Sequence, residues 1–165
     1  MRPSWLSVGA VVVALAGAAA LARGAMPQSG AAGGATAGSA PIVISGAYVR
    51  QPASPELAAV YLTIYNTTSR PDTLTSVTSG SGESSSVHTE VNSSMVENTS
   101  GLVIPAHGSV VLKPTTGHIM IQKLYGTLKA GQTVNLELDF ANAGPVLVTA
   151  PVIGIYDPVP PGASK

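Results

Sequence analysis

The chain has 165 residues, enough for one domain of ordinary size, and its formal net charge is zero with only 10% of the residues charged. Typical soluble proteins are about one quarter charged, and nucleic-acid-binding proteins carry basic patches, so this composition argues against a nucleic-acid partner. The absence of cysteine excludes a disulfide framework, a thiolate zinc site, a cysteine nucleophile and the cysteine-containing blue-copper site.

The first 25 residues have the pattern of a secretory signal. Arg2 supplies a positive charge, and the 17 residues from Leu6 to Ala22 that follow it carry none. We therefore expect residues 1–25 to be a signal peptide or, if uncleaved, an N-terminal membrane anchor, with the rest of the chain exported. A lipid anchor is not expected because no cysteine follows. Residues 26–40 are rich in Gly, Ala and Ser, which predicts a flexible linker.

Short apolar and β-branched runs alternate with turn residues from Pro41 onward. The runs that predict strands are Ile42–Val49, Ala58–Asn66, Asp72–Ser79, Ser85–Val91, Gly101–Gly108, Ser109–Pro114, His118–Leu124, Thr133–Phe140 and Val146–Val152. Eight or nine strands at about ten-residue spacing, with no helical periodicity, predict an all-β antiparallel sandwich or barrel over residues 41–156. The Pro-rich tail, residues 157–165, is predicted to be disordered.

His118 and Met120 lie two residues apart in the run that ends at Leu124. Alternate side chains of a strand share a face, so an imidazole and a thioether are expected side by side, opposite the core face formed by Ile119 and Ile121. Imidazole and thioether together suit Cu(I) better than zinc or magnesium. The alternative is a core histidine packed beside a gap-filling methionine.

A second histidine and methionine, His88 and Met95, are separated by a polar stretch that is predicted to be a loop. Core packing explains an exposed loop methionine poorly, so two histidines and two methionines form a candidate soft metal site. Glu90 and Glu97 flank it and are interpreted as solvated loop charges, although either could assist Cu(II). His107 is interpreted as a solvated histidine in a turn.

The segment from Ile42 to Val152 resembles the PCu(A)C family of exported copper chaperones. The matching pieces occur in family order: GAYVRQP, AAVYLTIYNTTSRPDTL, SVHTEV, GLVIPAHGSVVLKPTTGHIMIQKL and LKAGQTVNLELDF. The copper motif of the family is a His, a Met, and then a His followed by x-Met, which maps onto His88, Met95, His118 and Met120. Six residues separate His88 from Met95 here, fewer than is usual in the family.

The resemblance implies a cupredoxin-like Greek-key β-sandwich that binds Cu(I). Binding of Cu(II) is left open as an alternative. It also implies partners: the copper subunit of cytochrome c oxidase and a Sco-type chaperone. We predict a periplasmic or cell-surface copper chaperone rather than an enzyme, because neither a Ser-His-Asp set nor a paired-carboxylate site is recognisable. The alternatives are a copper buffer or scavenger without a delivery role, and a structural or adhesive sandwich without metal.

Overall fold

The computed structural model describes residues 40–163, and the predicted signal and nearly all of the predicted linker lie outside them. Ten strands form the described part, which contains no helix and hence none that could cross a membrane. The strands are β1 (Ile42–Arg50), β2 (Leu57–Asn66), β3 (Asp72–Ser79), β4 (Gly82–Val91), β5 (Ser94–Glu97), β6 (Leu102–Ile104), β7 (Ser109–Leu112), β8 (Gly117–Leu124), β9 (Thr133–Phe140) and β10 (Gly144–Ile153).

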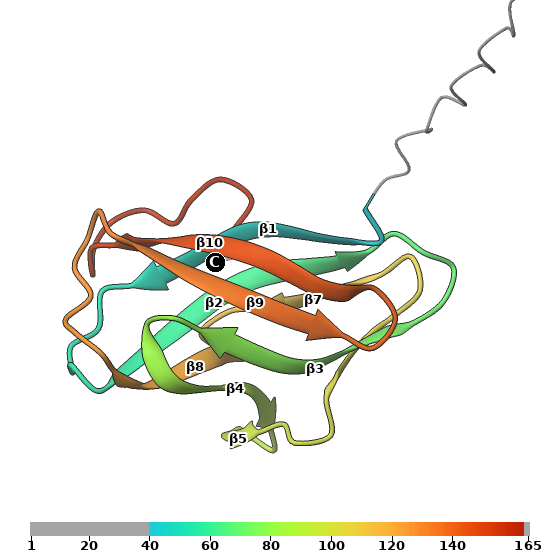
Figure 1. The fold of residues 1–165 in the computed structure, drawn as a ribbon, viewed down its shortest axis with the longest axis horizontal. Coiled ribbons are helices and arrows are strands. Elements are labelled where there is room, and N and C mark those ends of the chain that lie inside the picture. The colour runs from blue at the N-terminus through green and yellow to red at the C-terminus, as the bar shows by residue number, and fades with distance from the viewer. Residues whose placement is uncertain (1–39, 164–165) are drawn as a thin grey trace, which may run out of the picture. The chain divides into compact units, whose positions relative to one another are not determined.

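The strands follow the order β5-β4-β8-β2-β1-β10-β9-β3-β6, and β7 pairs with β2. All pairs are antiparallel except β1 with β10, where the sheet turns from one layer to the other. The layer of β10, β9 and β3 thus lies over the layer of β2, β8 and β7 (Figure 1). This arrangement confirms the prediction of an all-β, cupredoxin-like sandwich.

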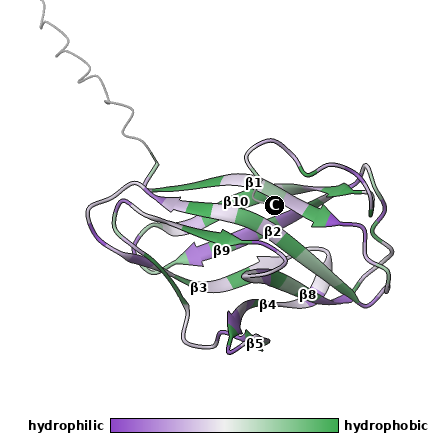
Figure 2. Ribbon diagram, turned by 180° about the vertical axis from the view of Figure 1, so that it is seen from behind, coloured by the Kyte–Doolittle hydropathy of each residue, from purple (hydrophilic) through white to green (hydrophobic). Residues whose placement is uncertain are grey.

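A single hydrophobic core lies between the two layers. Alternate residues such as Val60, Leu62 and Ile64 of β2 are buried, and they meet Leu136 and Leu138 of β9. Hydrophobic residues recur along these strands (Figure 2). Because the core takes one face of each strand, the other face of β4, β8 and β2 is available for a site.

The stretch between His88 and Met95, predicted to be a loop, is instead a tight hairpin between β4 and β5. Asn92 and Ser93 have φ values of 51° and 64°, and two successive positive values are typical of the primed turns that join antiparallel strands. Val91 pairs with Ser94, so the hairpin has a two-residue turn. β5 is consequently an edge strand, and all four of its residues are exposed.

The C-terminal tail, for which the sequence predicts disorder, is described as far as Ala163 and folds back along β1. The Arg50 guanidinium donates from Nη1 to the carbonyls of Gly154, Ile155 and Asp157. In the middle of β1, the absence of a side chain at Gly46 admits the Ala163 backbone. These contacts hold the tail against β1 at two points.

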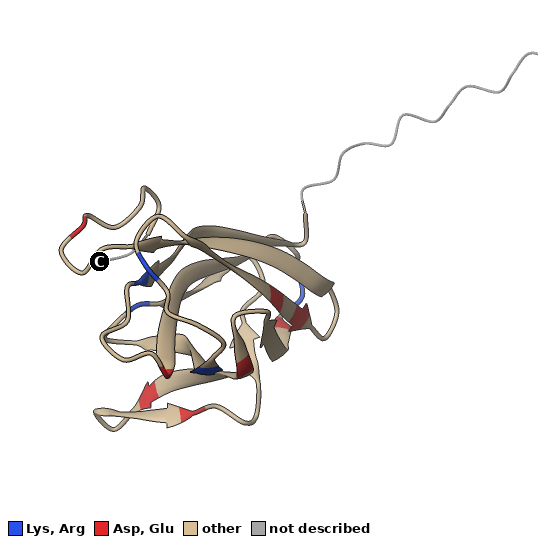
Figure 3. Ribbon diagram, turned by 60° about the vertical axis from the view of Figure 1, so that its left-hand side comes forward, with Lys and Arg blue, Asp and Glu red and all other residues tan. Residues whose placement is uncertain are grey.

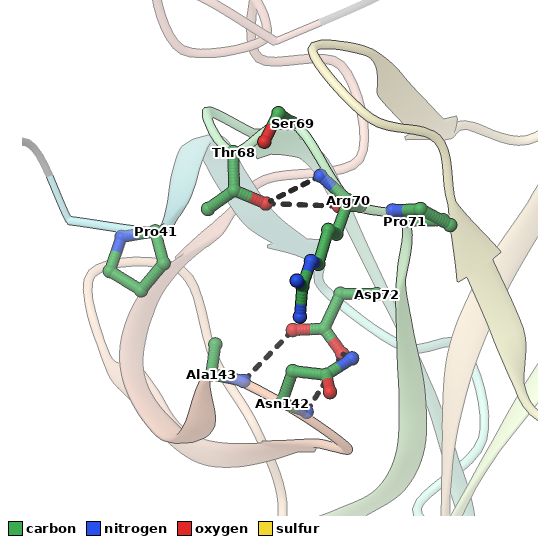
Figure 4. A pocket seen from close by; sticks show the side chains of 8 residues that line it. All are labelled: Pro41, Thr68, Ser69, Arg70, Pro71, Asp72, Asn142 and Ala143. Carbon is green, nitrogen blue, oxygen red and sulfur yellow. Dashed lines mark hydrogen bonds between the residues drawn. The ribbon is translucent and has the colours of Figure 1, made fainter.

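Asp72 is a buried carboxylate that ties the start of β3 to the turn between β9 and β10. It accepts hydrogen bonds from the backbone N–H of Thr73 (2.7 Å) and from both Asn142 and Ala143, as Figure 4 shows for the last two. Burial alone would raise the pKa of Asp72, but these hydrogen bonds lower it below the ordinary value of 3.8.

Asp72→Asn is expected to lower the free energy of unfolding by about 1–2 kcal/mol at neutral pH, because an amide cannot accept all these bonds. Since the folded-state pKa is lowered, the stabilisation is complete above pH 3.8 and is lost as the pH falls through the folded-state value. Urea unfolding at neutral pH and well below pH 3.8 should therefore show the difference between variant and wild type shrinking in acid. Glu137→Gln, at an exposed carboxylate on β9, is the control.

Candidate metal centre

Two neighbouring strands bring His88 and His118 together. In the register of β4 with β8 the two residues are direct partners, next to the core pair Val87 and Ile119. Alternation then directs both imidazoles to the outer face. The rings stack with their centroids 5.4 Å apart and an angle of 8° between their planes. Two histidines 30 positions apart in the sequence are thus adjacent on one face.

Met120 lies in the next row of the same face. It is half-buried, and its direct partner on β4 is Ser86. Four side chains are therefore direct neighbours on this face of the sheet: His88 beside His118, and Ser86 beside Met120. The sequence alone does not indicate Ser86, because a serine two residues before a histidine is common and its place opposite Met120 depends on the register of β4 with β8.

Met95 lies on the same face but one row away, at the edge of the sheet. The hairpin register pairs Met95 with Glu90 and Glu97 with His88. Met95 is thus diagonal to His88, at about 7–8 Å for such neighbours, and 38% of its surface is exposed. A flexible thioether side chain spans part of that distance. The structure therefore brings Met95 near the histidine pair, but not as a direct cross-strand neighbour of either histidine.

Glu90 and Glu97 are strand residues of the hairpin rather than loop residues, and both are exposed, as predicted. They make the β4–β5 edge acidic (Figure 3). Among residues 40–163, no three His, Cys, Asp or Glu side chains are grouped closely enough to hold a metal ion. The donor set at this face is consequently two imidazoles and thioether sulfur, which favours a soft ion over a hard one.

The imidazole of His118 is poised to accept a ligand. Its Nε2 is buried and has no hydrogen-bond partner. Burial is the main cause that lowers the pKa of His118 below its ordinary value of 6.5, and the neighbouring His88 lowers it further. The ring therefore stays neutral to a lower pH than an ordinary histidine, and a neutral ring can bind a metal without first losing a proton.

Tyr61 of β2 closes the flank of the site opposite to β4. Its ring meets His118 edge-on, with centroids 6.3 Å apart and an interplanar angle of 68°. Tyr48 of β1 lies beyond it, and the ring centroids of Tyr48 and Tyr61 are 5.1 Å apart. An aromatic wall on one side and the exposed β5 edge on the other leave the hairpin side as the open approach.

His107 takes no part in this arrangement. It is exposed, has a φ of 49° in the turn before β7, and its backbone N–H donates to the carbonyl of Thr68. The prediction of a solvated turn histidine is confirmed.

The family model described as "Putative lipoprotein LpqE-like" matches residues 42–152. The chain belongs to the LpqE-like family. No curated protein sequence matches it. The solution structure of CuI-DR1885 from Deinococcus radiodurans is 30% identical to the LpqE-like chain, with a TM-score of 0.59, and the match covers 73% of this chain and 83% of DR1885.

Two solved PCuAC domains share the fold of this LpqE-like chain at lower identity. The copper-bound PCuAC domain from PmoF2 is 23% identical with a TM-score of 0.60, and the match covers 69% of this chain and 93% of that domain. The apo PCuAC domain from PmoF1 is 21% identical with a TM-score of 0.61, covering 69% and 94%. The family match, together with these structures, confirms the resemblance to the PCu(A)C family.

Proposed function

We propose that this LpqE-like protein is an extracytoplasmic copper chaperone that binds one Cu(I) ion through His88, His118, Met120 and Met95. The observation that carries the proposal is the stacked histidine pair, with an unpartnered Nε2 on His118 and Met120 in the adjoining row. The copper-bound state of DR1885 and of the PmoF2 domain supports copper as the cargo. The lipoprotein description of the family supports an extracytoplasmic location.

The donor set suits a protein that carries copper rather than one that uses it. Thioethers and neutral imidazoles hold Cu(I) without thiols, which are lost to oxidation in exported compartments. Neutral ligands leave the charge of the ion uncompensated, so a thiolate acceptor can take the ion by supplying that charge. We therefore propose delivery to the copper centre of cytochrome c oxidase, with a Sco-type protein as a further partner, and no enzymatic role.

A Cu(I) competition titration under anaerobic, reducing conditions tests the binding site. Wild type should bind one tight equivalent. Met120→Leu should weaken binding by at least about tenfold, since it removes the sulfur donor in the row next to the histidine pair. Met95→Leu should weaken binding by less, because Met95 lies one row further away at the sheet edge. A larger loss for Met95→Leu would show that the hairpin closes over the ion.

Delivery needs a separate test in the organism. A strain that lacks the gene should lose oxidase activity when copper is limiting, and wild-type protein should restore it whereas His118→Ala should not. A strain that keeps its oxidase activity but becomes sensitive to copper would instead identify a buffer. An absence of tight Cu(I) binding in wild type would favour a structural sandwich without metal.

A further inference from the structure

One member of the site already has a partner within the chain. The Oγ of Ser86 lies 3.0 Å from Nε2 of His88, a hydrogen bond whose donor depends on the tautomer of the imidazole. The two stacked histidines are therefore not equivalent: Nε2 of His118 has no partner and Nε2 of His88 has one. Contacts within the chain thus hold one imidazole and leave the other open.

The position of Ser86 makes this bond a competitor of the metal. Ser86 lies opposite Met120 across β4 and β8. The nitrogen that it holds is thus the one directed toward the row of Met120. An ion bound between His88, His118 and Met120 would need that same nitrogen, so the hydrogen bond must break when the ion enters.

We infer that Ser86 is a positioning residue that regulates this site: its hydroxyl holds Nε2 of His88 while the site is empty, yields it to Cu(I), and takes it back when the ion leaves. This inference rests on the proposed function. By stabilising the copper-free state, Ser86 lowers the affinity and promotes release to an acceptor. One hydrogen bond of ordinary strength corresponds to about a two- to twelvefold change in affinity.

Ser86→Ala should therefore bind Cu(I) about two- to twelvefold more tightly than wild type and release it more slowly to excess bicinchoninate. Ser86→Thr keeps a hydroxyl in a residue that suits strands and should behave like wild type. Ser84→Ala is the matched control, because Ser84 lies on the same strand and face but opposite Gln122, and it is exposed. It should leave affinity and release unchanged.

A metal-free readout makes the test independent of copper. Long-range proton–nitrogen NMR spectra of the copper-free protein should show changed ring-nitrogen shifts of His88 in Ser86→Ala but not in Ser84→Ala. Unchanged shifts, or an affinity that is unchanged or weaker in Ser86→Ala, would overturn the role of Ser86 while leaving the copper site intact. Failure of wild type to bind Cu(I) would instead overturn the proposed function.

Discussion

His118→Ala is expected to weaken Cu(I) binding by at least about a hundredfold, since in the proposed site His118 coordinates the ion directly and the loss of a direct ligand exceeds that of an outer partner. His118 lies at the centre of the candidate site, between His88 on one side and Tyr61 on the other. Its Nε2 bonds to no other group of the described residues.

The same substitution should change the stability of the copper-free protein little. The buried Nε2 of His118 contributes no hydrogen bond to the fold, and its side chain points away from the core. Thermal unfolding without copper therefore separates a ligand from a structural histidine. A metal-free sandwich predicts the reverse pattern, with no tight binding to lose and a destabilisation on truncation.

His107→Ala is the matched control for this experiment. His107 is exposed in a turn and lies outside the histidine pair, so its loss should leave the Cu(I) titration as in wild type. A comparable loss of affinity in both variants would indicate that the ion is bound by scattered surface imidazoles. The stacked pair would then carry no special role.

The faces of the strands follow from the sequence alone, and the hairpin register does not. Strict alternation around Ile119 and Ile121 places His118 and Met120 on the outer face, which the structure bears out. The stretch after His88 is short and polar, and its two-residue turn depends on left-handed backbone at Asn92 and Ser93 rather than on a glycine. Its composition therefore predicts a loop.

Pairing between strands decides which side chains meet, and pairing is a long-range property. Glu97 becomes a neighbour of His88 only across the hairpin, and Ser86 becomes a neighbour of Met120 only through the register of β4 with β8. The contacts of the tail are long-range as well. Its composition predicts disorder, but Arg50, more than a hundred positions earlier, supplies hydrogen-bond donors for its carbonyls.

Gly117→Ala is expected both to destabilise the protein by about 1–3 kcal/mol, the cost of overpacking a tight site, and to weaken Cu(I) binding. Gly117 directly precedes His118 on β8. A Cβ added there would lie 2.5 Å from the backbone carbonyl oxygen of His88 and 3.1 Å from Cδ2 of Leu112. Backbone has to move to relieve such a contact, and the nearest backbone is that of the first histidine.

Chemical unfolding without copper and a Cu(I) titration, made on the same variant, check this expectation. Gly80→Ala is the control, because a Cβ added at Gly80 meets nothing within 4 Å. Stability and affinity should both fall in Gly117→Ala, whereas only affinity should fall in His118→Ala. If Gly117→Ala lost stability but kept its affinity, the spacing of His88 and His118 would not govern binding, and the flexible thioethers of Met95 and Met120 would have to hold the ion.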